Sequence, residues 1–225
     1  MGDRTETGRA VRAATRDPDP AIRLTAARAL GTEGEPILRE LVVDPLQSDA
    51  IGEAALAALG PRVTIATARG VLVRADSARV RSGGAALRLV AQGGEPEVPL
   101  VADLLMRVHG ALAIAAIEAL ATIGGPAVEA PLVEALRATE PAVAAAAARA
   151  LARRGSVGAV AALRDAERRG GEVAGPARTA IAAIQARLPG ASPGQVSLAD
   201  GDAGQVSIAS ANDGSVSLPP DEPPR

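Results

Sequence analysis

Few residues of this chain have types that could perform chemistry. His109, in the segment MRVHGALA, is the one histidine, and the chain has no cysteine, so no thiolate can act as nucleophile or metal ligand. A serine nucleophile needs a base beside it, and no serine has an evident one. Glu129 and Glu134 could form a carboxylate pair, but we interpret them as the solvated edge of a helix. We therefore expect no catalytic residue, no metal ligand and no cofactor, and His109 to be a solvated turn residue.

The composition predicts a helical core without aromatic side chains. The chain has 225 residues, 48% of them hydrophobic, and contains no Phe, Tyr or Trp, so its core must consist of Ala, Leu, Val and Ile. All 24 basic residues are arginines, which suggests a high-GC bacterial coding bias. The longest apolar run is interrupted by Glu118, and the charged N-terminus lacks the apolar stretch of a signal peptide. We expect a cytoplasmic protein without a membrane segment.

Charge alternates in blocks along the chain. The net charge is -2 overall, and the blocks carry -3 (1–60), +5 (61–92), -5 (93–140), +5 (141–189) and -4 (190–225). A DNA-binding protein typically has a single basic stripe, and single-stranded nucleic acid is usually held by aromatic stacking. Nucleic acid is therefore a disfavoured partner. Binding through backbone phosphates alone stays an alternative, with a steep loss of affinity in salt as its signature.

A two-helix unit is clearest in DPDPAIRLTAARALGTEGEPILRELVVDP, which begins at Asp17. Asp17 and Asp19 can cap a helix that starts near Pro20, because proline is tolerated in a first turn. Gly31 then ends this helix. The apolar residues of one helical face follow at helical spacing: Ile22, Ala26, Ala29 and Leu30. A second helix opens at Pro36 and carries Ile37, Leu38, Leu41 and Val42.

The same unit recurs along residues 17–188. Equivalent apolar positions are Leu30, Leu59, Leu89, Ile123, Leu151 and Ile184, at spacings of 29, 30, 34, 28 and 33 residues. Such a period is typical of stacked helix pairs, because one pair cannot bury its apolar face alone. The third unit, ADSARVRSGGAALRLVAQGG, is the least regular. We expect Gly83 and Gly84 to kink or shorten its helix.

The pattern DPxxxIRxxAAxALGxxG at residues 17–34 resembles HEAT repeats, in the short form known from bacterial phycobilisome-lyase-like proteins. The resemblance covers about six units. It implies an all-α fold, a right-handed α-α superhelix of the HEAT-like solenoid kind. Solenoids offer a long surface made by the second helix of each pair, which lines the concave side in HEAT-like arrays. Such a surface suits a protein-protein interaction scaffold or adaptor.

Some proteins with this fold are enzymes, which gives two alternatives. HEAT-like hydroxylases bind two irons through several His and Glu side chains, and the single His109 argues against such a site. Phycobilin lyases attach a tetrapyrrole to a partner protein and need a pocket that is typically lined with aromatic and polar groups. This chain has no aromatic residue, which argues against such a pocket. An accessory factor resembling these lyases is therefore the runner-up and not the favoured prediction. The favoured prediction is a non-enzymatic scaffold with a protein partner.

Polar positions of the second helices are the candidate partner-binding residues. Arginine suits this role because its guanidinium pairs with carboxylates through two hydrogen bonds. The candidates are Arg39, Arg62, Arg69, Arg74, Glu97, Asp103, Glu134, Arg137, Arg164 and Arg168. As a group, their alternating charges favour a partner of complementary pattern.

The two ends of the chain differ from the repeats. Residues 1–16 read as an N-terminal capping helix, or as the second half of a repeat whose first half is missing. Residues 189–225 are expected to form a disordered tail, since Pro189, Gly190 and Pro193 end the last helix.

The tail carries a short motif three times at intervals of ten residues. Burying one Val and one Leu stabilises by about 3–6 kcal/mol, while ordering five residues costs roughly 5–10 kcal/mol. Each copy would therefore become ordered only on a partner, by adding a strand to a sheet edge, with avidity from three copies. Neutral duplication is the alternative. The motif residues are Val196, Ser197, Leu198, Val206, Ser207, Ile208, Val216, Ser217 and Leu218.

Overall fold

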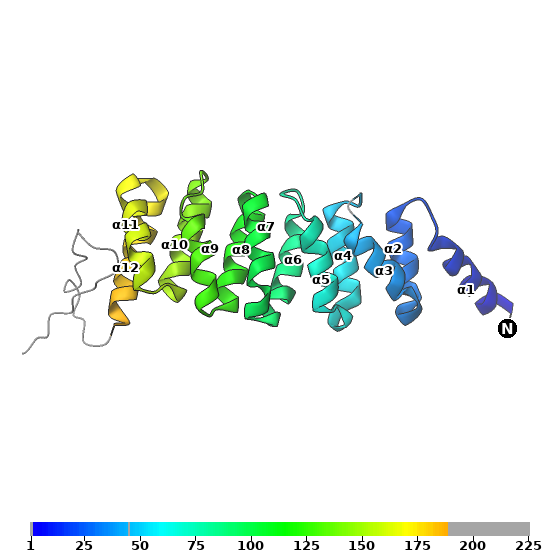
Figure 1. The fold of residues 1–225 in the computed structure, drawn as a ribbon. Helices are drawn as coiled ribbons and strands as arrows, with labels where there is room; N and C mark the ends of the chain where they lie inside the picture. Colours follow the sequence, from blue (N-terminus) through cyan, green and yellow to red (C-terminus); the bar gives the residue numbers. More distant parts are fainter. Residues whose placement is uncertain (1, 45, 189–225) are drawn as a thin grey trace, which may run out of the picture.

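The computed structural model describes residues 2–44 and 46–188 as a row of helices standing side by side (Figure 1). These residues form twelve α-helices joined by turns and short 3-10 helices, and they form no strand. The α-helices are α1 (Gly2–Ala14), α2 (Pro20–Ala29), α3 (Glu35–Val43), α4 (Asp49–Leu59), α5 (Ile65–Arg74), α6 (Val80–Val90), α7 (Val98–Arg107), α8 (Gly110–Ile123), α9 (Glu129–Ala135), α10 (Pro141–Arg154), α11 (Val160–Arg169) and α12 (Ala174–Ala186).

The helices pack in two rows by one repeated rule. Each even-numbered helix contacts the next even-numbered helix, from α2 through to α12, and also the odd-numbered helix just before it. Helices α3, α5 and α7 contact one another in the same order and belong to the second row. We call α2 to α12 the even row and α3 to α11 the odd row. This arrangement is the all-α, HEAT-like solenoid that the sequence predicts.

Local capping explains where the first helices begin. Asp19 is the N-cap of α2, and its carboxylate accepts a hydrogen bond from the backbone N–H of Ala21 at 2.8 Å, with Pro20 as the first helical residue. Pro36 lies in the first turn of α3, where its missing N–H has no intrahelical partner to lose. Both starts are confirmed.

The core is a continuous layer of small and branched aliphatic side chains between the two rows. It includes the fully buried leucines Leu41, Leu72, Leu104, Leu132 and Leu163, one from each helix of the odd row. Helix α10 contacts α8, α9 and α12, and each residue from Val143 to Ala148 is buried. A helix surrounded on several sides reads as apolar all round, and alanine lets its neighbours approach closely.

The expected kink at the double glycine is wrong. Helix α6 runs without interruption from Val80 to Val90 through Gly83 and Gly84. A Cβ atom at Gly83 would lie 2.9 Å from Cδ1 of the buried Leu112 in α8, so this glycine allows the two helices to approach. Tertiary packing overrides the weak helix propensity of glycine here.

Acidic side chains tie the start of one repeat to the next. The Asp49 carboxylate accepts hydrogen bonds from the backbone N–H groups of Arg81 and Ser82, both at 2.8 Å, at the first turn of α6. Partial burial raises the pKa of Asp49, but these bonds and one from the Ser82 hydroxyl outweigh it and hold the pKa below its usual value. Glu140 likewise accepts from the N–H of Gly110 at 3.0 Å, at the start of α8. Negative groups at helix N-termini complement the helix dipole.

The N-terminal helix α1 contacts α2, but less extensively than α3 contacts α4. Arg12 of α1 pairs with Glu33 in the turn after α2, with Nε and Oε1 at 2.6 Å. Among the described helices none is long and apolar enough to cross a membrane. The predicted tail, 189–225, lies outside the described residues.

Candidate functional site: a groove between α7 and α9

The structure places the predicted partner-binding residues along the odd row and its adjoining turns. Seven of the ten lie on helices of this row, and the other three lie in turns beside it. Arg164 is half-buried, Glu97 is buried, and the remaining residues are exposed: Arg39, Arg62, Arg69, Arg74, Asp103, Glu134, Arg137 and Arg168. Arg168 is held by Asp165, one helical turn away.

Glu97 is not part of an exposed docking surface. It is 2% exposed and accepts two hydrogen bonds from Arg69, one of them from Nε at 2.8 Å. These bonds hold the pKa of Glu97 below its usual value. The pair links α5 to the turn that precedes α7. Helical periodicity alone did not show that this turn residue points inward.

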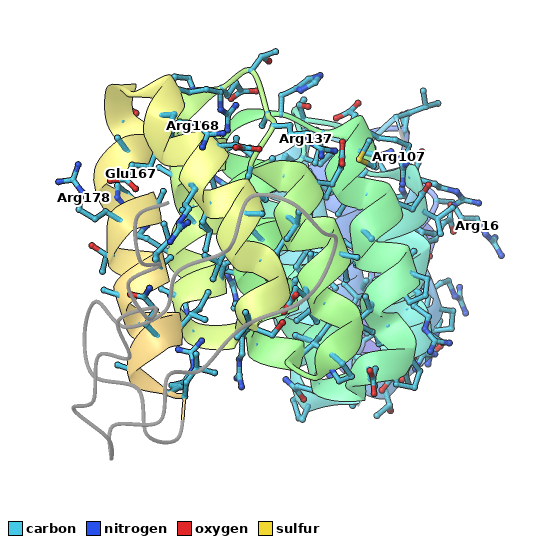
Figure 2. All side chains as sticks on the ribbon, turned by 60° about the vertical axis from the view of Figure 1, so that its left-hand side comes forward. Arg16, Arg107, Arg137, Glu167, Arg168 and Arg178 are labelled. Atoms are coloured by element: carbon cyan, nitrogen blue, oxygen red, sulfur yellow. The ribbon has the colours of Figure 1, made fainter. Side chains whose placement is uncertain are left out.

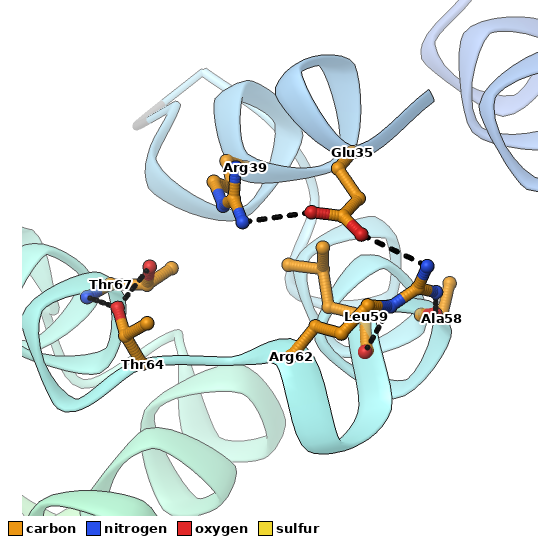
Figure 3. A network of polar contacts seen from close by, with 7 residues as sticks. All are labelled: Glu35, Arg39, Ala58, Leu59, Arg62, Thr64 and Thr67. Carbon is orange, nitrogen blue, oxygen red and sulfur yellow. Dashed lines mark hydrogen bonds and ion pairs between the residues drawn. The ribbon is translucent and has the colours of Figure 1, made fainter. Parts of the chain in front are cut away.

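A second polar network joins α3 to the turn before α5 (Figure 3). The Glu35 carboxylate accepts from Arg39 at 2.9 Å and pairs with Arg62 at 3.0 Å. Arg62 also donates to the carbonyl of Leu59 at 3.2 Å. Both guanidinium groups therefore already have a partner within the chain, and the pair of Arg62 with Glu35 joins neighbouring repeats.

A series of arginines at the ends of odd-row helices links each repeat to the one before it. Arg74, the last residue of α5, donates to the carbonyl of Val43 at 3.1 Å. Arg107, the last residue of α7, donates to the carbonyls of Leu72 and Ala75, both at 3.4 Å. Cations at helix C-termini satisfy free carbonyls and complement the helix dipole.

The series resumes at the far end of the row, where Arg169, the last residue of α11, donates to the carbonyl of Leu136 after α9. The even row has similar links, such as Arg154 to the carbonyl of Ala121 at 2.7 Å. We call Arg74, Arg107, Arg154 and Arg169 the linking arginines.

Arg137 interrupts this series. By position it corresponds to Arg107 and Arg169, but it lies just beyond α9 and donates to Glu134 at 2.7 Å instead of to α7. Its side chain is 71% exposed. Helix α9 has seven residues, whereas the other helices of the odd row have nine or ten. In Figure 2, Arg168, Arg137 and Arg107 follow one another along one edge of the array.

A groove of about 620 Å³ lies where this link is missing. Its apolar part comes from α7, α9 and the even-row helices beneath them: Ala102, Leu105, Met106, Val108, Ala113, Ala130, Pro131, Ala135, Ala138 and Val143. Met106 is 70% exposed, so most of its apolar side chain is accessible to a binding partner. The volume falls within the range of small-ligand and side-chain binding sites.

Charged and polar side chains form the rim of the groove. Asp103 pairs with Arg107 at 3.1 Å, and Glu134 with Arg137 as described above. Glu140, which accepts from the Gly110 N–H, lies 3.7 Å from Nδ1 of the exposed His109. Within residues 2–44 and 46–188, no three acidic or histidine side chains gather closely enough to hold a metal ion. The arrangement is suited to binding.

Sequence reasoning identified part of this site. Asp103, Glu134 and Arg137 are brought together at the rim, but Met106 and Glu140 were missed. The regular spacing of Arg74, Arg107, Arg137 and Arg169 was a usable signal, although the exception at Arg137 requires the structure. The other predicted residues lie on the odd row or in the turns beside it, away from the groove, and the tail motif lies outside the described residues.

Comparison with known proteins yields one match. Residues 98–184, from the start of α7 into α12, match the family model of HEAT repeats, and this span contains the whole groove. No curated protein and no solved structure matches the chain. The finer resemblance to phycobilisome-lyase-like repeats stays a prediction.

Proposed function

Because this chain is a HEAT-repeat protein, we propose that it is a non-enzymatic scaffold that binds a protein partner in the cytoplasm through its odd row. The observation that carries the proposal is the groove between α7 and α9, with its apolar floor and charged rim. Protein interfaces commonly combine an apolar centre with a polar surround.

The charges of the odd row support recognition of a partner. Arg137 and Arg168 each pair with a carboxylate three residues away on an exposed surface. Exposed pairs of this kind contribute only about 0–1 kcal/mol, so a partner's charges can replace them at little cost. The alternating blocks then favour one register of the partner along the array.

The test is site-specific crosslinking in cells that make the full chain. A photo-reactive amino acid replaces Arg39 or Met106 on the odd row, or the exposed Arg88 or Arg149 on the even row as matched controls. We expect discrete protein adducts from the odd-row positions and few from the controls. Equal labelling from both rows, or none from either, contradicts the proposal.

A further inference from the structure

Resting on the proposed function, we propose that the groove between α7 and α9 binds a basic partner segment. This segment inserts an apolar side chain between the two helices and places Arg or Lys beside it. The occupant is a separate protein, and neither a second copy of this chain nor its own tail fills the groove.

The groove lies at the place in the odd row where a linking arginine is missing. Linking arginines join α3 to α5 and α5 to α7, and another joins the end of α9 to α11. Between α7 and α9, Arg137 turns to Glu134. This change leaves a gap in the odd row above the even-row residues Ala113 and Val143. The groove therefore lies where the series of linking arginines is interrupted.

The lining of the groove accepts an apolar side chain. Alanines at 102, 130 and 138 leave space where larger residues would fill it, and Leu105 and Met106 supply apolar contact area. Methionine adapts its shape to different partners because its side chain is unbranched and flexible. An anchor residue that enters such a pocket typically carries much of the binding energy of an interface.

The net charge of the rim favours a partner segment of positive charge. Three carboxylates, those of Asp103, Glu134 and Glu140, stand at the rim against two guanidinium groups, Arg137 and the Arg107 that pairs with Asp103. The segment 93–140 as a whole has seven acidic residues and two arginines. Lys or Arg on a partner segment would therefore meet a net negative rim, and complementary charge sets specificity and association rate.

The same charges argue against the chain itself as occupant. Residues 190–225 carry -4, the same sign as the rim. Many arginines of the two basic blocks are already engaged within the chain, as are Arg69 with Glu97, Arg153 with Glu118 and Arg178 with Glu167. A second copy has a net charge of -2, the same sign as the rim, although some of its arginines, such as Arg88 and Arg149, are exposed.

The first experiment pans a displayed library of random short peptides against the full-length protein. Enriched peptides should combine an apolar residue with Arg or Lys. Ala130→Trp, at an exposed position of α9, fills the groove and should weaken binding of the enriched peptides by about tenfold or more. Ala182→Trp, at an exposed position of α12, is the matched control and should leave binding unchanged. Far-ultraviolet circular dichroism and thermal melts verify that both variants fold.

The second experiment uses the same peptides to test the rim. Asp103→Asn and Glu134→Gln should each weaken binding by about threefold to tenfold, and added salt should reduce the difference. Arg137→Ala should strengthen binding by about twofold to fivefold, because it removes a like charge and frees Glu134. A purely structural role for Arg137 would not produce tighter binding.

The proposal is overturned if the enriched peptides are acidic, if Ala130→Trp binds them normally, or if no peptide is enriched. It is also overturned if sedimentation shows that the wild-type chain self-associates and Ala130→Trp abolishes the association. Crosslinking from the odd row could still succeed in each case, so the groove proposal can fail while the scaffold function stands.

Discussion

The paired glycines of α6 provide a sharp test of the packing between repeats. Gly83 and Gly84 are adjacent residues inside one helix, and both are buried. A Cβ at Gly83 would meet Leu112 at 2.9 and 3.3 Å, whereas a Cβ at Gly84 would meet no atom within 4 Å beyond its own turns of helix. We therefore expect Gly83→Ala and Gly84→Ala to change the free energy of unfolding by different amounts or in opposite directions, although their local sequence is nearly the same.

The magnitude follows from two opposing effects. Replacing glycine by alanine inside a helix stabilises by about 0.8–1.0 kcal/mol, and this gain applies to both variants. At position 83 the added methyl group also overpacks against Leu112, which is fully buried and cannot easily move away. Overpacking typically costs about 1–3 kcal/mol. The two variants should therefore differ by about 1–3 kcal/mol, with Gly84→Ala the more stable.

Thermal melts of the full chain measure this difference. One kcal/mol shifts Tm by about 2–4 °C in a protein of this size, so the two Tm values should differ by about 2–12 °C. Leu112→Ala alone should destabilise by about 2–5 kcal/mol, yet it should remove the overpacking penalty of Gly83→Ala in a double-mutant cycle. If Gly83→Ala raises Tm as much as Gly84→Ala does, the close approach of α6 and α8 is refuted.

Three other predictions follow from the contacts. Arg169→Ala should lower Tm by about 3–12 °C, because it removes a hydrogen bond from a charged group worth about 1.5–3 kcal/mol. Arg137→Ala should leave Tm within about 1 °C, and equal shifts of the two variants in thermal melts would contradict the interrupted series of linking arginines. The hydrogen bonds from Arg69 hold the pKa of Glu97 in the folded state below its value of about 4.3 in the unfolded state. The ionised Glu97 therefore stabilises the fold above about pH 4.3, and this stabilisation is lost as the pH falls through the pKa of the folded state. Urea unfolding across acidic pH should therefore show a shallower decline for Glu97→Gln than for wild type, and parallel curves would rule this out. A linear tetrapyrrole mixed with the protein should show no change in visible absorbance, and a shift would instead favour the lyase-like alternative.

The repeats and their helix starts were predictable because they depend on neighbours in sequence. Asp19 caps α2 through a group two residues away, and Pro36 fits the first turn of α3 whatever surrounds it. Seven of the ten candidate residues lie on the helices to which they were assigned, and Arg62, Glu97 and Arg137 lie in turns beside them. Apolar residues at helical spacing indicate which face is buried, even when the packing partner is unknown.

The candidate site was predictable only in part. Asp103, Glu134 and Arg137 were proposed as polar surface positions, but nothing in their spacing indicates that they surround one groove. Glu97 was assigned to the exposed surface and is buried by Arg69, which lies 28 residues earlier in the chain. Both outcomes depend on how neighbouring repeats meet.

The sequence by itself determined the all-α repeat architecture, its aliphatic core and its alternating charge, because turns of helix and caps form between residues a few positions apart. The tertiary structure decided the uninterrupted α6, the burial of Glu97 and the gap between α7 and α9. Each of these depends on side chains about one repeat apart in sequence, where a single methyl group or one hydrogen bond decides how closely two helices approach.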